Sequence, residues 1–384
     1  MEAYLDNAAT TRCYDSVKEI VVKTMMEDYG NPSSMHRKGV EAEQYMREAR
    51  QKIARTIKAA EQEIYFTSGG TESNNWALMG AALAKKRQGR HIITTQIEHA
   101  AVAAPLAFLE EQGFRITRLR PDREGRIDLE ELEEAVTDDT ILASVMYVNN
   151  EIGAVQDIAA VSERLKRKNS GAYLHVDAIQ AYGKYRILPK RLGIDLLSVS
   201  GHKIHGPKGT GFLYIGDKVR IHPLILGGGQ QGGMRSGTDN VPGAAGLGEA
   251  AARIYENLEE NSAHMAELRR YLTEELSRMP DVVLHGMDGG QGAPHIVSAS
   301  FLGVRSEVLL HTLEDRQIYV SAGSACSSHK RAGSATLTAI GCSQAERESA
   351  VRFSFSEQTT REELDYTLEV LGQALPMLRR FTRR

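Results

Sequence analysis

Lys203 lies directly after an expected strand, in the segment SVSGHKIHGPKGTG, beside Ser200 and His202. A lysine amine forms an imine with an aldehyde cofactor once its ammonium group has lost a proton, and burial or nearby positive charge favours that loss. Short hydroxyl and imidazole side chains beside it suit a phosphate group. Taken alone, the segment has two other interpretations: Lys203 as a solvated loop charge, or His202 and His205 as ligands of a weak metal site.

Asp177 ends another expected buried strand, in YLHVDAIQAYGK. A buried carboxylate is costly unless it is paired. A protonated pyridine nitrogen is a suitable partner, because the pair keeps such a cofactor an electron sink. Gln180, three residues further on, can donate to a ring oxygen. The H-x-D spacing leaves open a facial iron site made of His175, Asp177 and a distant His99, although His175 lies deeper along the strand.

Two other segments also place polar groups after expected strands. In TSGGTESNN, Gly69 and Gly70 let the backbone approach a ligand, and Thr71 with the first helical N–H groups can hold an anion. An ordinary strand–helix turn has the same composition. In QIEHAAVAAP, His99 can stack on a ring and move protons, or it can simply cap the following helix.

Cys326 lies in SAGSACSSHKRAGSA, a run of small residues that suits neither a core nor a helix. A thiolate there would be a nucleophile, and the basic residues His329, Lys330 and Arg331 would favour the ionised form. The alternative for a free cysteine is a small, buried, apolar side chain. Small neighbours would let Cys326 move between an inward and an outward position.

Short β-rich runs alternate with helical patterns up to about residue 215, which favours a largely parallel sheet covered on both faces. These runs are EIYFTS, HIITT, ILASVMYV, AYLHVD, DLLSVS and GFLYI. After about residue 250, long helical patterns and further β-rich runs predict a smaller α+β domain. We therefore divide the chain into a large domain over 12–250 and a small domain over 1–11 and 251–384.

The overall composition excludes several classes of protein. The 384 residues carry a formal net charge of −3, which points to no nucleic-acid or membrane partner. The first residues lack the pattern of a secretory signal, and no apolar run is long enough to span a bilayer. Three widely spaced cysteines, Cys13, Cys326 and Cys342, predict no disulfide framework and no paired metal motif. We expect a cytoplasmic protein.

The segments taken together resemble the cysteine desulfurases, the NifS/IscS-like branch of the fold-type I (class V aminotransferase-like) pyridoxal-phosphate enzymes. The matching segments, in chain order, are YLDNAATT, YGNPSS, TSGGTESNN, IEHAAV, NNEIGAVQ, HVDAIQAYGK, SGHKIHGPKGTG, GGGQQGGMRSGTDN, SAGSACSS and RFSF. They extend from residue 4 to about residue 356. The resemblance implies an α/β fold: a large domain with a mostly parallel seven-stranded sheet flanked by helices, plus a smaller α+β domain.

The resemblance also implies how pyridoxal 5'-phosphate would be bound. Lys203 would form the imine, Asp177 would pair with the ring nitrogen, and His99 would stack on the ring. Gln180 would donate to the ring oxygen. The phosphate would be held by Gly70, Thr71, Ser200 and His202, and by Thr238 of the neighbouring subunit in an obligate homodimer.

The substrate implied by the resemblance is L-cysteine. Asn150 would lie beside cofactor and substrate, and Arg352 would bind the substrate carboxylate, although an arginine on a strand can also be an exposed charge. Lys203 would take the Cα proton. Cys326 would then attack the substrate sulfur and become a persulfide, leaving L-alanine.

The recipient of the sulfur stays open between an iron–sulfur scaffold, a tRNA-thiolating enzyme and another carrier. The basic HKRAGSATL after Cys326, the variants RFSFS and GGGQQ, and the ending PMLRRFTRR depart from the family pattern. A selenocysteine lyase, an aminotransferase on the same fold and a non-enzymatic binding module are the alternatives.

Overall fold

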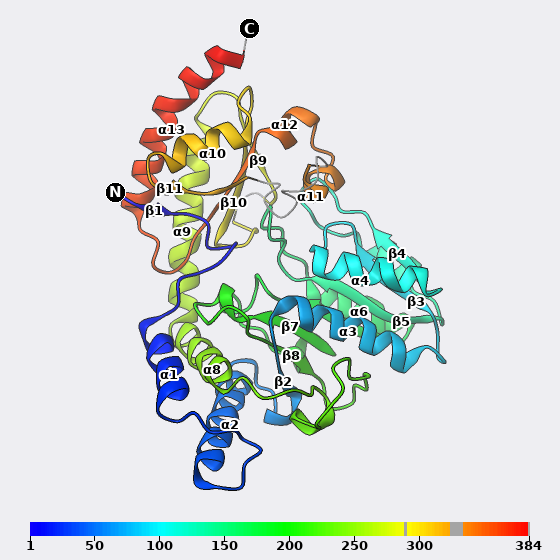
Figure 1. Ribbon diagram of the computed structural model, residues 1–384. Coiled ribbons are helices and arrows are strands. Elements are labelled where there is room, and N and C mark those ends of the chain that lie inside the picture. Colours follow the sequence, from blue (N-terminus) through cyan, green and yellow to red (C-terminus); the bar gives the residue numbers. More distant parts are fainter. Residues whose placement is uncertain (288–289, 323–332, 383–384) are drawn as a thin grey trace.

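The centre of the molecule is a seven-stranded sheet, seen in a computed structural model that describes residues 1–384 except 288–289, 323–332 and 383–384 (Figure 1). Its strands are β2 (Ile64–Thr67), β3 (His91–Thr95), β4 (Arg115–Leu119), β5 (Thr140–Met146), β6 (Tyr173–Asp177), β7 (Leu196–Ser200) and β8 (Gly211–Ile215). Their order is β2-β8-β7-β6-β5-β3-β4, and β8 runs in the direction opposite to the other six strands. This confirms the mostly parallel sheet that was predicted.

Helices cover both faces of this sheet, which explains why its strands read as nearly continuous apolar runs. The helices of this part of the chain are α1 (Asp15–Met26), α2 (Arg37–Ile57), α3 (Gly70–Lys85), α4 (Ala100–Glu111), α5 (Leu129–Ala135), α6 (Ile158–Lys168), α7 (Pro189–Leu192) and α8 (Val241–Glu256). Short 3-10 turns are η1 (Glu61–Glu63), η2 (Gly201–Lys203) and η3 (Gln231–Gly233).

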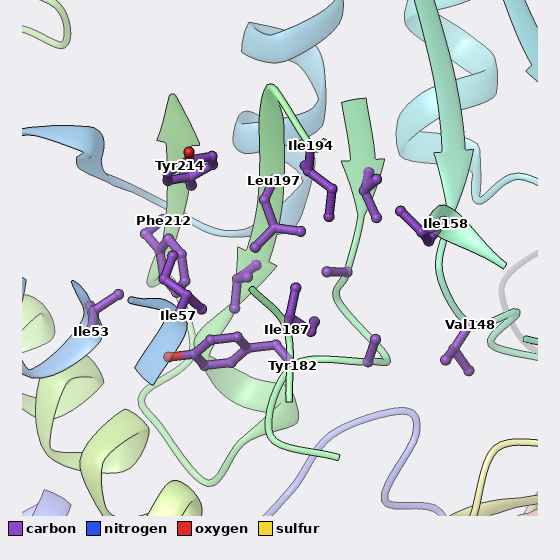
Figure 2. Close-up of a cluster of buried hydrophobic side chains, with 14 of the residues drawn as sticks. Ile53, Ile57, Val148, Ile158, Tyr182, Ile187, Ile194, Leu197, Phe212 and Tyr214 are labelled. Carbon is purple, nitrogen blue, oxygen red and sulfur yellow. The ribbon is translucent and has the colours of Figure 1, made fainter. Parts of the chain in front are cut away.

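Adjacent strand residues enter different cores, because successive side chains point to opposite faces. Leu197 packs with side chains of α2, α6 and α8, whereas its neighbour Leu196 packs with α3 and α4. Figure 2 shows the first of these cores, where Leu197 and Phe212 of the sheet lie near Ile57 of α2 and Tyr182 of the loop after β6.

A second, antiparallel sheet of order β12-β13-β10-β9 forms a separate α+β part, as predicted. Its strands are β9 (Val282–His285), β10 (Ile296–Phe301), β12 (Ser321–Ala322) and β13 (Ala350–Ser354), and β1 (Ala3–Tyr4) pairs with β11 (Ile318–Tyr319) beside it. The helices are α9 (Leu258–Ser277), α10 (Ser306–Glu314), α11 (Ala335–Ala339), α12 (Gln344–Glu348) and α13 (Arg361–Thr382), seen in the upper part of Figure 1.

This second part has a core of its own, to which β1, α9, α10, β10, β13 and α13 contribute. The first residues of the chain thus join segments that follow residue 250. The exact domain boundaries at residues 11 and 250 stay a prediction. Among the described residues, no helix combines the length and the apolar character needed to cross a bilayer.

Candidate active site

A cavity of about 420 Å³ lies where the carboxyl ends of the central strands meet the second sheet. In open α/β sheets this edge is the usual place for a ligand. The structure brings most of the predicted site residues together here, although they come from distant parts of the sequence. The predicted positions that line the cavity are Gly70, Thr71, His99, Asn150, Asp177, Gln180, Ser200, His202, Lys203 and Arg352.

Two predicted site residues are not among those lining residues. Thr238 is exposed on the loop between β8 and α8, which the ion pair of Arg235 with Glu72, at 2.9 Å, ties to the first turn of α3. Cys326 lies outside the described residues. The roles expected for Thr238 and Cys326 therefore stay predictions.

The side-chain amine of Lys203 is held at the cavity by the loop that follows β1. Its Nζ donates to the carbonyl oxygens of Ala8 at 2.7 Å and Ala9 at 2.5 Å. The backbone N–H of Thr11 donates to the His202 carbonyl at 2.9 Å, which joins the same two segments. The lysine is thus an ordered group of the site and not a solvated loop charge.

Asp177 is a buried carboxylate at the end of β6, with its oxygens held by two donors. Asn74 Nδ2 donates to Oδ2 at 2.7 Å, and the backbone N–H of Ile179 donates to Oδ1 at 3.0 Å. Burial raises the pKa of Asp177. Asn74 was missed by the sequence analysis; its signal is an amide on the buried face of α3.

His99 both caps α4 and lines the cavity, so the two interpretations of this residue are compatible. Its Nδ1 accepts from the backbone N–H of Ala101 at 3.1 Å, which places the proton of the neutral ring on Nε2. Burial lowers the pKa of His99. A neutral imidazole with a fixed tautomer therefore faces the cavity.

The beginning of α3 and the end of β7 together offer an anion-binding arrangement. α3 starts at Gly70, and its first residues line the cavity together with Ser200 and His202. The free N–H groups at such a helix start can bind an anion. A Cβ at Gly70 would lie 2.2 Å from Ile179 Cδ1, so a larger residue there would require the Ile179 side chain to move. Burial, followed by the charge of Lys203, lowers the pKa of His202 to about 4, which makes it a neutral donor.

Arg352 on β13 faces this cavity from the second sheet. Its Nη1 donates to the Asn150 carbonyl at 2.7 Å, and its Nη2 contacts Asp6 Oδ1 at 2.9 Å and Ser321 Oγ at 3.1 Å. The residue is 7% exposed, so the alternative of an exposed strand charge is wrong. Its Nε is buried without a partner among the described residues.

His175 is unsuited to the iron site that the H-x-D spacing left open. Its Nδ1 lies 2.8 Å from Ser144 Oγ and its Nε2 lies 2.9 Å from Ser198 Oγ, and the ring is fully buried. Burial lowers the pKa of His175 to about 3. Since both nitrogens are engaged and the ring does not line the cavity, His175 is a core residue.

Two glutamates near the cavity were not anticipated from the sequence. Glu98 Oε1 accepts from the backbone N–H of Met146 at 2.9 Å and from Thr95 Oγ1 at 2.8 Å, and burial raises the pKa of Glu98 to about 8. Glu151, which lines the cavity, accepts from Thr336 Oγ1 at 3.0 Å. Only the fold shows that these acidic side chains are partly buried and hydrogen-bonded beside the cavity.

The comparisons with known proteins agree with this geometry. A model of the family described as aminotransferase class-V matches residues 3–367. A curated relative from Clostridium botulinum (strain Hall), named cysteine desulfurase IscS, is 41% identical over 380 residues, which are 98% of this chain and 95% of the relative.

Solved structures show the same similarity. A structure described as a NifS-like protein superposes with a TM-score of 0.93 at 39% identity and covers 98% of this chain and 100% of its own. One described as SspA in complex with cysteine has a TM-score of 0.81 at 33% identity and covers 93% of this chain and 100% of its own.

Proposed function

The chain belongs to the class-V aminotransferase family, and from that premise we propose that it is a pyridoxal-phosphate-dependent cysteine desulfurase. It would convert L-cysteine into L-alanine and pass the sulfur on through Cys326. The observation that carries the proposal is the meeting of Lys203, Asp177, His99 and Arg352 around one cavity. The relatives named cysteine desulfurase, and the similar structure described with bound cysteine, support this choice of substrate.

The residues of the cavity fit the cofactor. A volume of about 420 Å³ lies within the usual range of small-ligand pockets. The buried carboxylate of Asp177 needs a positive partner there, which a protonated pyridine nitrogen supplies. The N–H groups of α3, with Thr71, Ser200 and His202, suit the phosphate. Pyridoxal phosphate, when bound, provides the electron sink for the carbon that loses its proton.

Lys203 is the base of this proposal. Its Nζ, positioned by the carbonyl oxygens of Ala8 and Ala9, would take the Cα proton of L-cysteine and later return a proton to the product. His99, with its proton fixed on Nε2, would stack on the cofactor ring as a neutral group. Gln180 already donates one amide hydrogen to Ala8 at 2.9 Å, and its second hydrogen is suited to the ring oxygen.

Arg352 would bind the carboxylate of L-cysteine through its two terminal nitrogens. The Asn150 carbonyl orients the guanidinium, and Asp6 contacts the edge that the substrate carboxylate would use. The substrate would therefore compete with Asp6 for the same arginine. Once bound in place of Asp6, the carboxylate of L-cysteine would be held by Arg352.

Cys326 would accept the sulfur. Its thiolate attacks the substrate sulfur, a new S–S bond forms, and the Cβ–S bond breaks with its electron pair going to carbon. That carbon takes up a proton and the product leaves as L-alanine. The balance is L-cysteine plus the Cys326 thiol giving L-alanine plus a Cys326 persulfide, so no external oxidant is needed. An iron–sulfur scaffold or a tRNA-thiolating enzyme would then take the sulfur.

A homodimer is part of the proposal, because Thr238 is exposed and would reach the phosphate of a partner subunit. Large apolar side chains of α1, of the segment that leads into α2 and of the first turn of α2 are also exposed, which suggests that another surface covers them. They are Val22, Met25, Met26, Tyr29, Met35 and Val40. Sedimentation equilibrium of the purified protein tests this state, and a monomer that retains full activity would refute it.

The proposed function is tested by measuring L-alanine and sulfide formed from L-cysteine in the presence of a thiol reductant. Wild type should form both products in equal amounts. Lys203→Ala should form neither, whereas the exposed Lys208→Ala should match wild type. A Lys203→Ala variant that forms alanine at the wild-type rate would sink the proposal.

A further inference from the structure

Three potential metal ligands meet away from the cavity, where β9 approaches the turn between α11 and α12. They are His285 at the end of β9, Cys342 in the turn and Glu346 on α12, and one ligand atom from each lies within 4.8 Å of the others. We propose that this His285–Cys342–Glu346 cluster binds one divalent transition-metal ion of the zinc class. The inference does not depend on the proposed desulfurase activity.

The hydrogen bonds around Ser300 fix the tautomer of His285. Ser300 Oγ donates to the backbone oxygen of Glu346 at 2.6 Å, which uses its only proton. Its contact with His285 Nε2, also at 2.6 Å, must therefore be a bond that Nε2–H donates. The lone pair of His285 consequently sits on Nδ1, the nitrogen that faces Cys342. A partner that orients the far nitrogen in this way is typical of metal-binding histidines.

The distance between the first two ligands already suits a tetrahedral ion. Cys342 Sγ lies 3.6 Å from His285 Nδ1. Zinc bonds of about 2.3 Å to sulfur and about 2.0–2.1 Å to nitrogen, at a tetrahedral angle, span an S···N edge of about 3.6 Å. Without metal, the same pair is a thiol donating to an imidazole. Metal binding would release the thiol proton to solvent and transfer no electron.

Glu346 completes a set of sulfur, nitrogen and oxygen ligands. Its carboxylate is oriented by a capping box, in which the backbone N–H of Ser343 donates to Oε2 at 2.6 Å. A thiolate and a carboxylate together balance the charge of a dication. The soft thiolate selects zinc-class ions over magnesium or calcium. Three protein ligands leave a fourth position for water or another ligand.

The surroundings of the cluster allow both access and order. His285 and Glu346 are half-buried and Cys342 is buried, so an ion could enter from the surface. Arg347 Nη1 donates to the Cys342 carbonyl at 2.9 Å. Burial, followed by the charge of Glu346, raises the pKa of the Cys342 thiol, so the ion itself must displace the thiol proton. Cys342 also packs with Ile152, of the loop that carries Asn150. A bound ion would stabilise the turn that contains Cys342, which packs against the loop that lines the cavity with Asn150.

Zinc binding should be measured on the cofactor-loaded Cys326→Ala protein, because that background removes the other reactive thiol. Equilibrium dialysis against Zn²⁺, followed by elemental analysis, should give one ion per chain. Cys342→Ser and His285→Gln should each bind at least about 100-fold more weakly. Ser300→Ala keeps all three ligands but removes the hydrogen bond that fixes the tautomer of His285. This variant should bind zinc about 10- to 100-fold more weakly.

Cys13→Ser, made in the same background, is the matched control. The Cys13 thiol donates a hydrogen bond to the Gly206 carbonyl and lies away from the cluster. It should bind zinc as its parent does. A parent protein without a stoichiometric zinc ion would overturn the proposal, as would unchanged binding in His285→Gln. If Cys342→Ser fails to fold, judged by cofactor absorbance and thermal melting, the His285 and Ser300 variants decide the outcome.

Discussion

The guanidinium of Arg352 and the carboxylate of Asp6 form an ion pair at 2.9 Å in the cavity wall, joining the chain's first residues to β13. Under the proposed function this pair must open when the substrate carboxylate binds. Arg352→Lys keeps the charge but loses the planar fork. We expect a loss of about 2–3 kcal/mol, or roughly 30- to 150-fold in kcat/KM, with unchanged cofactor absorbance. Steady-state kinetics with L-cysteine test this expectation.

The matched change for that prediction is Arg347→Lys, because Arg347 lies on α12 outside the cavity. It should leave kcat/KM at the wild-type value. An Arg352→Lys enzyme with wild-type kinetics would show that another group binds the substrate carboxylate.

Asn74 supports Asp177 through the 2.7 Å bond to Oδ2. Asn74→Ala removes a hydrogen bond to a charged group, which typically costs about 1.5–3 kcal/mol. We expect cofactor binding to weaken at least about tenfold, measured by titrating the cofactor-free protein and following absorbance. Asn75→Ala, one position further along α3, is the control because its amide donates to the Thr71 carbonyl within the helix at 2.9 Å and not to Asp177. Equal affinities for both variants would contradict the support role.

Glu98 should make stability depend on pH. Its pKa in the folded protein is about 8 and its ordinary value is 4.5, so the folded state binds more protons between these values. The contribution of this group to the free energy of unfolding is therefore fully present below pH 4.5 and is lost as the pH rises through 8. Glu98→Gln removes the titration, and its melting temperature relative to wild type should rise from pH 5 to about pH 8 and level off above that.

A control for that measurement is Glu111→Gln, since Glu111 is exposed at the end of α4. The difference in melting temperature between this variant and wild type should stay flat over the same range. A flat difference for Glu98→Gln as well would contradict the raised pKa.

His175 and His99 should behave differently when they are replaced. His175→Asn leaves the buried hydroxyls of Ser144 and Ser198 without their partner, so we expect a loss of about 2–4 kcal/mol in the free energy of unfolding. The folded fraction should keep its activity and its colour. His99→Asn should instead lower kcat with little change in stability. Denaturant titration and kinetics on both variants separate a core role from a site role.

The sequence predicted most of the site because the relevant side chains follow strands. Asp177 ends β6, and Lys203 and His99 lie in the short segments that follow β7 and β3; the carboxyl ends of parallel strands meet at one edge. Their neighbours could not be found in this way. Asn74 lies one turn inside α3, where the sequence gives no sign of its contact with Asp177. Glu98 looks like an ordinary polar residue in the sequence, and only the structure shows its contact with the end of β5. Arg352 required the pairing of β13 with β12 and β10.

The central claim is that sulfur leaves L-cysteine by way of Cys326. The most direct measurement is a single turnover without reductant, followed by mass spectrometry of the peptide that contains Cys326 and by quantification of alanine. The account predicts one alanine per active site and a mass increase of one sulfur atom on Cys326, with no change on Cys13 or Cys342. Stoichiometric alanine together with an unmodified Cys326 would contradict it.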